Sequence, residues 1–174
     1  MEKHSDGYRP DLDGSDGDFW SAMKYHSANF AMPSWQVSMN QLSNHDHSRF
    51  LTRTNRKVGR NSTLGAEAAS EGINKGTFRA AVVMQMTWMG APTIYYGDEA
   101  GVCGFTDPDN RRTYPWGHED HDMIAFHKDI IRLRRENDEL RNGSLKQIDS
   151  AQNYLAYARF HEKGQCVILI NNSR

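Results

Sequence analysis

Hydrophobic residues in the middle of the chain recur with the spacing of an α-helix. Four of them lie three or four residues apart and would share one helical face: Phe78, Val82, Met86 and Met89. Alanine and valine residues between these positions extend the apolar surface most of the way round, so the pattern predicts a buried helix. Gly90 stands where such a helix would end.

A second helical pattern is amphipathic. Its apolar positions are Met123, Phe126, Ile130 and Leu133, and its opposite side carries Lys128, Asp129, Arg132 and Arg135. The pattern predicts a surface helix that begins after Asp120, whose carboxylate can accept hydrogen bonds from the first turn. We also expect a short helix within residues 19–32, and a loop over residues 53–76 with a helix around Ala66 to Glu71.

Two short runs have the composition of interior strands. Val37 to Leu42 is mostly apolar or amide, although its spacing alone leaves strand and helix open, and Thr93 to Tyr96 is β-branched and aromatic. Carboxylates follow both runs: Asp46 after the first, and Asp98 and Glu99 after the second. Ligands bind at the C-terminal ends of strands in parallel α/β sheets and barrels, so we expect a ligand site there.

The C-terminal part of the chain changes character. Three β-like runs, SLKQI, NYLAYARFH and QCVILIN, are separated by short polar turns and predict an antiparallel sheet. The sequence therefore divides into a flexible leader or loop (residues 1–18), an α/β segment (19–142) and the start of an all-β domain (143–174).

Charge and cysteine content narrow the function classes. With 21 Lys and Arg against 22 Asp and Glu, the chain has no basic excess for nucleic acid, and no apolar run is long enough for a membrane span or a signal peptide. Cys103 and Cys166 match no metal-ligand spacing, so we expect reduced structural thiols and a cytoplasmic protein. The acidic run DLDGSDGD lacks the glycine and glutamate spacing of a calcium loop.

Three motifs in succession carry a family resemblance. SNHDHSRF, GAPTIYYGDEAGVCGFTDPDNRRTYPW and RLRREN resemble the last third of the alpha-amylase superfamily of glycoside hydrolases, in its neopullulanase, cyclomaltodextrinase and maltogenic amylase branch. The resemblance extends from about Pro33 to the end of the chain. It implies that residues 19–142 form about the last two βα units of a (β/α)8 barrel, and that residues 143–174 begin a β-sandwich.

The resemblance also implies roles for individual residues. Asp46 would be the family's third carboxylate, which hydrogen-bonds the sugar at the cleaved subsite and favours its distorted form, and His45 would bind hydroxyls of the same sugar. Asp107 and Arg111 would contact sugars further along the non-reducing side. A structural ion pair that shapes the loop is the alternative for these two residues. We expect no cofactor and no metal.

The family's nucleophile and general acid/base belong to earlier barrel strands, and their motifs are absent from this sequence. We therefore expect a piece of a longer retaining α-glucan hydrolase that cleaves α-1,4 linkages, with α-1,6 linkages as a further option. Its substrates would be maltodextrins, cyclodextrins or pullulan. The isolated chain would be inactive, and its exposed barrel edges could pair two copies into a homodimer.

Two other classes stay open on the residues alone. One is a non-catalytic carbohydrate-binding or assembly module that uses the half-site. The other is a metal-dependent His-Asp phosphohydrolase that would use His26, His45 and Asp46, but that site needs the doublet on a helix. Four aromatic residues could either stack on sugars or fill the core: Trp88, Tyr95, Tyr96 and Trp116.

Overall fold

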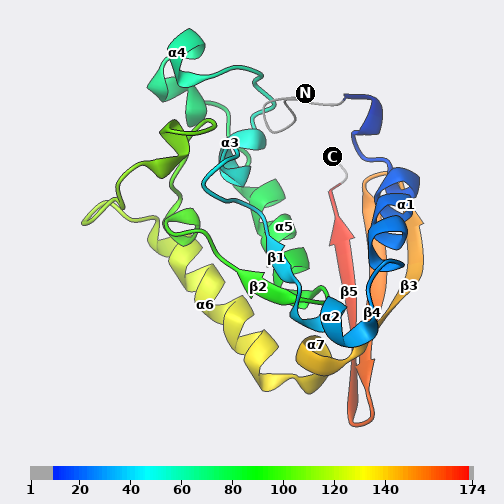
Figure 1. Ribbon diagram of the computed structural model, residues 1–174. Coiled ribbons are helices and arrows are strands. Elements are labelled where there is room, and N and C mark those ends of the chain that lie inside the picture. The colour runs from blue at the N-terminus through cyan, green and yellow to red at the C-terminus, as the bar shows by residue number, and fades with distance from the viewer. Residues whose placement is uncertain (1–9, 173–174) are drawn as a thin grey trace. The chain divides into compact units, whose positions relative to one another are not determined.

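The computed structural model describes residues 10–172 of the chain, which is an α/β structure (Figure 1). Within these residues, one compact unit comprises residues 41–82 and 93–129, and the other comprises residues 10–40, 83–92 and 130–172. In the described part of the chain, no helix is both long enough and apolar enough to cross a membrane.

The elements follow one another along the chain as labelled in Figure 1. The α-helices are α1 (Asp16–Ser27), α2 (Met32–Val37), α3 (Phe50–Arg53), α4 (Asn61–Leu64), α5 (Lys75–Thr87), α6 (His121–Glu136) and α7 (Asp138–Asn142). Short 3-10 helices are η2 (Pro10–Leu12), η3 (Ala66–Ala69), η4 (Asp98–Ala100) and η5 (Asp109–Arg111). Strand β1 (Met39–Gln41) pairs with β2 (Ala91–Thr93), and β3 (Ser144–Ala151), β4 (Tyr154–His161) and β5 (Gly164–Asn171) form a second sheet.

Helices α5 and α6 confirm the two predicted helical patterns. Phe78 and Val82 on α5 have no exposed surface. Helix α6 begins at His121 because the carboxylate of Asp120 accepts a hydrogen bond from the N–H of Met123 at 3.0 Å. Leu133, the last position of the apolar repeat on α6, is 45% exposed.

Residues 10–18, the described part of the predicted leader over residues 1–18, contain helical turns. Residues 1–9 lie outside the described residues, but η2 and the first turn of α1 occupy most of the rest. Helix α1 begins at Asp16 because the Ser15 hydroxyl accepts a hydrogen bond from the N–H of Asp18. Asp16 and Asp18 in the first turn also suit the positive end of the helix dipole.

Both predicted interior strands are shorter than expected. In the first run, Val37 is the last residue of α2, and only Met39–Gln41 form the strand β1. In the second run, β2 ends at Thr93, so Tyr95 and Tyr96 lie after the strand. The pairing depends on a close backbone approach, because a Cβ atom on Gly90 would lie 2.7 Å from the carbonyl oxygen of Ser38. The ends of β1 and β2 depend on this pairing between segments distant in the sequence, which local composition does not predict.

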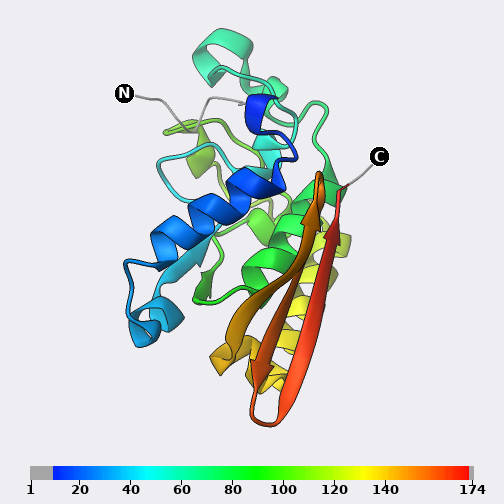
Figure 2. The ribbon, with the colours of Figure 1, turned by 90° about the vertical axis from the view of Figure 1, so that its right-hand side faces the viewer.

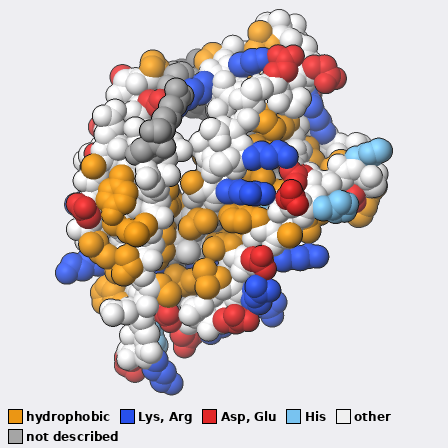
Figure 3. Space-filling model, turned by 180° about the vertical axis from the view of Figure 1, so that it is seen from behind, with side chains coloured by type: hydrophobic (Ala, Val, Ile, Leu, Met, Phe, Trp, Pro, Cys, Tyr) orange, Lys and Arg blue, Asp and Glu red, His pale blue; other side chains and the backbone are white. Residues whose placement is uncertain are grey.

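The three C-terminal strands confirm the predicted antiparallel sheet (Figure 2). Their order is β3-β4-β5, and a bulge interrupts β3 between Gln147 and Asp149. Hydrophobic side chains gather on the left of the face shown in Figure 3, where the ribbon places the sheet. Four hydrophobic side chains of the sheet are more than two fifths exposed: Ile148, Phe160, Val167 and Leu169.

The opposite side of this sheet contributes to the core of its unit. The core cluster comprises Trp20, Trp88, Met89, Leu140, Tyr157 and Ile168. Three polar side chains at this core are hydrogen-bonded: the hydroxyls of Tyr157 and Thr87 lie 2.6 Å apart, and the buried Arg159 donates to the carbonyl oxygens of Thr87 and Gly143. These hydrogen bonds join the end of α5 to the sheet and provide acceptors for the buried charge of Arg159.

Candidate functional site

Asp46 and His45 project from a loop between β1 and α3. The side-chain oxygen of Asn44 accepts hydrogen bonds from the N–H groups of Asp46 at 2.9 Å and His47 at 3.1 Å, which closes a tight Asx-type turn. The two candidate side chains are therefore held outward, 61% exposed for His45 and 67% for Asp46. His45 Nε2 lies 3.4 Å from the carboxylate of Asp46.

Asp107 and Arg111 lie on a neighbouring loop and at the end of η5. Arg111 Nε donates to Asp107 Oδ1 at 2.5 Å, and both side chains are about half exposed. The hydrogen bond to Asp107 is the main cause that raises the pKa of Arg111, and the charge of Asp46 adds to it. The two loops are in contact, because the hydroxyl of Thr106, next to Asp107, donates to the carbonyl oxygen of Asp46 at 2.6 Å. The half-exposed Arg111 fork still faces solvent.

A cavity of about 580 Å³ opens beside this ion pair. Its lining includes Asp107 and Arg111, together with Arg60, Asn61, Ser62, Thr106, Pro108, Asp109 and Arg112. Neither His45 nor Asp46 is part of this lining. Eight of these nine lining residues have polar or charged side chains, which offer donors and acceptors to a ligand rich in hydroxyl groups.

The side chain of Arg49 contacts both the segment after β2 and the loop that carries Arg111. It is fully buried, and its guanidinium lies 4.5 Å from the ring centre of Tyr95 and 4.9 Å from that of Tyr96. It donates to the carbonyl oxygen of Asn110 at 2.9 Å and to Asp98 Oδ1 at 2.9 Å. One side chain therefore connects the segment after β2 with the loop that ends in Arg111.

Asp98, the first of the two carboxylates that follow β2, lies inside the protein. Asp98 is 4% exposed and pairs with Arg49, so it cannot reach a ligand. Burial raises the pKa of Asp98, whereas the hydrogen bond from Ser43 and the charge of Arg49 oppose that rise. Among the aromatic residues, Trp88 is core at 6% exposed and Trp116 is 79% exposed.

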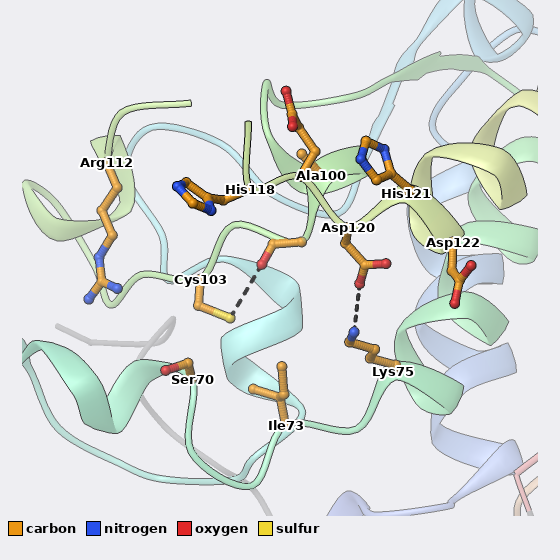
Figure 4. Close-up of a pocket in the computed structure, with 12 residues that line it drawn as sticks. Ser70, Ile73, Lys75, Ala100, Cys103, Arg112, His118, Asp120, His121 and Asp122 are labelled. Carbon is orange, nitrogen blue, oxygen red and sulfur yellow. Dashed lines mark hydrogen bonds and ion pairs between the residues drawn. The ribbon is translucent and has the colours of Figure 1, made fainter. Parts of the chain in front are cut away.

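A second cavity, of about 620 Å³, has mixed charge (Figure 4). Lys75 and Asp120 form an ion pair at 2.6 Å at its side, and His118 and His121 lie near the same loop. Its lining contains none of the four predicted site residues. Among the described residues, no group of three His, Cys, Asp or Glu side chains could hold a metal ion.

The metal-dependent phosphohydrolase alternative loses support from the same geometry. The His45–Asp46 doublet lies in a loop and not on a helix.

Cys103 and Cys166 are free, as expected.

Sequence reasoning missed three residues that organise the site: Arg49, Thr106 and Asn110. Arg49 and Asn110 have no exposed surface, and Thr106 is 9% exposed. Each stands in a polar stretch of sequence, where a buried side chain is not expected from composition. The signal available in the sequence was their position in or next to the motifs, since Arg49 lies in SNHDHSRF, Asn110 lies in DPDNRR and Thr106 directly precedes DPDNRR.

Comparison with known proteins identifies the family. The family model described as "Alpha amylase, catalytic domain" matches residues 16–145, which is most of the chain. The chain belongs to the alpha-amylase family. Amylopullulanase of Thermoanaerobacter thermohydrosulfuricus is 39% identical over 133 residues, covering 75% of this chain and 9% of that protein. Neopullulanase 2 of Thermoactinomyces vulgaris is 36% identical over 137 residues, covering 76% of this chain and 20% of the relative.

Solved structures of alpha-amylase relatives agree with this assignment. A cyclomaltodextrinase structure matches with a TM-score of 0.75 at 31% identity, over 91% of this chain and 25% of that chain. Cyclic alpha-maltosyl-(1-->6)-maltose hydrolase from Arthrobacter globiformis has a TM-score of 0.75 at 19% identity, over 94% of this chain and 35% of that chain, and shows likeness of fold alone. The chain spans only about a fifth or less of the curated relatives named above. These relatives support the predicted glycoside hydrolase class.

Proposed function

We propose that this chain is the part of a retaining α-glucan hydrolase that stabilises the sugar at the cleaved bond. The observation that carries the proposal is the contact between the loop of Asp46 and the segment of Asp107 and Arg111, which hydrogen-bond to each other through Thr106 and Asn110. The substrates proposed are maltodextrins, cyclodextrins or pullulan. The proposed main activity is cleavage of α-1,4 linkages, and α-1,6 linkages are the second proposed target.

Asp46 has the surroundings that this role requires. Retaining glycosidases pass through an oxocarbenium-like transition state, and a carboxylate that hydrogen-bonds the distorted ring lowers the barrier. Asp46 is exposed, and its backbone is held by the Asn44 turn, so its carboxylate is accessible to a ligand from a fixed backbone position. His45 would add a ring nitrogen for a hydroxyl of the same sugar.

Asp107 and Arg111 would bind the next sugars on the non-reducing side. The guanidinium presents several N–H donors and the carboxylate presents acceptors, so the pair can replace water on neighbouring hydroxyls of one sugar. Their half-exposed position beside the 580 Å³ cavity supports this role over a purely structural ion pair.

The complete active site would also need a nucleophilic Asp and an acid/base Glu, whose family motifs this sequence does not contain. We therefore place residues 19–142 in the last two βα units of a (β/α)8 barrel of a longer enzyme, followed by the start of a β-sandwich. A cytoplasmic location is part of the same proposal, which the free thiols of Cys103 and Cys166 support.

The decisive variant is Asp46→Asn in the active enzyme that contains this chain. We expect kcat on pullulan or β-cyclodextrin to fall by about 10²-fold or more with little change in thermal stability, because the lost interaction acts mainly in the transition state. The control is Asp129→Asn, which neutralises an exposed carboxylate on α6 away from the site. Near-full turnover by Asp46→Asn would refute the assigned role.

A second measurement separates the enzyme proposal from a binding module. The 174-residue chain alone should release no reducing sugar from pullulan, β-cyclodextrin or maltotriose. Calorimetric titration with maltotriose then tests binding: a Kd in the micromolar range in the isolated chain would favour the non-catalytic carbohydrate-binding alternative. Hydrolysis by the isolated chain would show that the proposed division of catalytic residues is wrong.

A further inference from the structure

The side chain of Asn110 links the two halves of the candidate site. It has no exposed surface and directly precedes Arg111 on η5. Its Nδ2 atom donates to the carbonyl oxygen of Asn44 at 3.1 Å and to that of His47 at 2.7 Å. These two carbonyl groups flank the His45–Asp46 pair, so one amide group holds the backbone on both sides of the candidate carboxylate.

The orientation of this amide follows from its neighbours. Two carbonyl oxygens face it, so the NH2 group and not the oxygen must point toward them. The side-chain oxygen of Asn110 is buried and has no hydrogen-bond partner among the described residues. A buried acceptor without a partner disfavours folding, so the donor function of Asn110 must outweigh this cost.

Other contacts between the same two segments reinforce the link. Thr106 Oγ1 donates to the carbonyl oxygen of Asp46 at 2.6 Å, and the N–H of Arg49 donates to the carbonyl oxygen of Gly104 at 2.9 Å. The chain packs so closely here that a Cβ atom on Gly104 would lie 2.8 Å from the Cα atom of Asn110. The loop carrying Asp107 and Arg111 therefore determines the path of the loop carrying Asp46.

We infer that Asn110 is a positioning residue that sets the direction of the Asp46 carboxylate relative to Arg111. This inference rests on the proposed function of Asp46. Asn110 is buried and does not touch a sugar itself. It acts by fixing the peptide groups on either side of the carboxylate, and a shift of about 1 Å in a reacting group can cost about 10²-fold in rate.

Kinetics of Asn110→Ala and Asn110→Asp in the active enzyme test the inference. Alanine removes both hydrogen bonds, and aspartate keeps the size of the side chain but turns acceptors toward two carbonyl oxygens. We expect kcat to fall about 10- to 100-fold with KM changed less than about threefold, because Asp46 acts in the transition state.

The matched control is Asn55→Ala. Asn55 also uses its Nδ2 atom to bind a backbone carbonyl in the same compact unit, that of Ala68 at 3.1 Å. Its side-chain oxygen accepts from the N–H of Lys57, which also lies outside the two site loops. This variant should keep kcat unchanged. A fall in kcat for Asn55→Ala equal to that for Asn110→Ala would show a general effect of stability and would overturn the inference.

A double-mutant cycle with Asp46→Asn separates positioning from a merely structural role. If Asn110 acts through Asp46, the double variant Asp46→Asn/Asn110→Ala should have about the same kcat as Asp46→Asn alone. Losses that multiply would mean that Asn110 acts elsewhere, which would overturn the inference.

Hydrogen exchange provides a readout that does not depend on catalysis. Peptides that cover residues 44–48 should exchange at least about tenfold faster in Asn110→Ala than in Asn55→Ala, because the Asx turn loses its support. Unchanged exchange would overturn the inference and leave the proposed function intact. Normal turnover by Asp46→Asn would instead refute the proposed function, whatever the exchange result.

A second variant covers the case in which Asn110→Ala does not fold. Thr106→Val removes the hydroxyl that binds the carbonyl oxygen of Asp46 and preserves the shape of the side chain. It should lower kcat about three- to tenfold and accelerate exchange in the same peptides, since one of three supporting bonds is lost. Full activity with unchanged exchange in Thr106→Val would contradict the inference.

Discussion

Arg49 and Asp98 form a buried ion pair although 49 positions separate them in the sequence. Arg49 Nη1 lies 2.9 Å from Asp98 Oδ1, and the side chains are 0% and 5% exposed. The pair connects the start of α3 with η4, and Arg49 also donates to the carbonyl oxygen of Tyr96. Removing either partner leaves a charge inside the protein without compensation.

Asp98→Ala should therefore be strongly destabilising. We expect the free energy of unfolding to fall by about 3–5 kcal/mol, because the Arg49 guanidinium would stay buried without its counter-ion. Urea denaturation followed by circular dichroism measures the change. The control is Asp138→Ala, which breaks an ion pair with Arg141 whose side chains are 45% and 49% exposed and should cost at most about 1 kcal/mol. Equal losses for both variants would show that burial does not decide the effect.

Arg111→Ala tests the sugar-binding role of the half-exposed ion pair. Loss of charge-assisted hydrogen bonds to sugar hydroxyls should raise KM for maltotriose or longer maltodextrins roughly 10-fold and leave kcat within about threefold. Arg111→Lys should recover little, because a lysine ammonium cannot reproduce the fork. Steady-state kinetics against chain length measures this, with the exposed α6 residue Arg135→Ala as control. Unaltered KM would favour the structural ion pair.

The lowered pKa of Asp120 should make the folded protein less stable at acidic pH. Burial opposes ionisation, but the Lys75 ion pair and the hydrogen bond from Met123 prevail and lower the pKa of Asp120 below its ordinary 3.8. A carboxyl group whose pKa is lower in the folded than in the unfolded protein stabilises the fold at pH values above its pKa in the unfolded protein. This stabilisation is lost as the pH falls through the pKa of the folded protein, so the loss should begin near pH 4. Asp120→Asn should reduce stability by about 1 kcal/mol at pH 7 and flatten this decline. Thermal unfolding from pH 2 to 7 measures both effects, and an identical pH profile would contradict the prediction.

The two cysteines should react slowly in the folded protein. Burial and the carboxylate of Glu139, whose Oε1 accepts from the thiol at 3.1 Å, raise the pKa of Cys166 to about 11, and burial raises that of Cys103. At pH 8 only about one Cys166 side chain in a thousand would be the reactive thiolate. Alkylation by iodoacetamide, followed by mass spectrometry, should be roughly 100-fold slower than in urea. Glu139→Gln should accelerate it at Cys166 and not at Cys103. Rapid labelling of the native protein would refute this.

The sequence predicted the long periodic elements well. Helices α5 and α6 and strands β3 to β5 each repeat one hydrophobic period over many residues, and a period of that length identifies both the element and its buried side. It was less successful with β1 and β2, each of three residues, because so short a strand is defined by its partner and not by its own composition. The four site residues came from motif order, and their roles stay predictions.

By itself, then, the sequence determined the chemical groups, the family and the elements with a sustained period, because these follow from residue types and local spacing. Only the tertiary structure decided that Arg49 and Asn110 lie buried between loops, and that Asn110 binds the backbone on both sides of Asp46. Such contacts join segments about 60 residues apart. Hydrogen bonds between polar side chains and distant carbonyl groups leave no periodic signal along the chain.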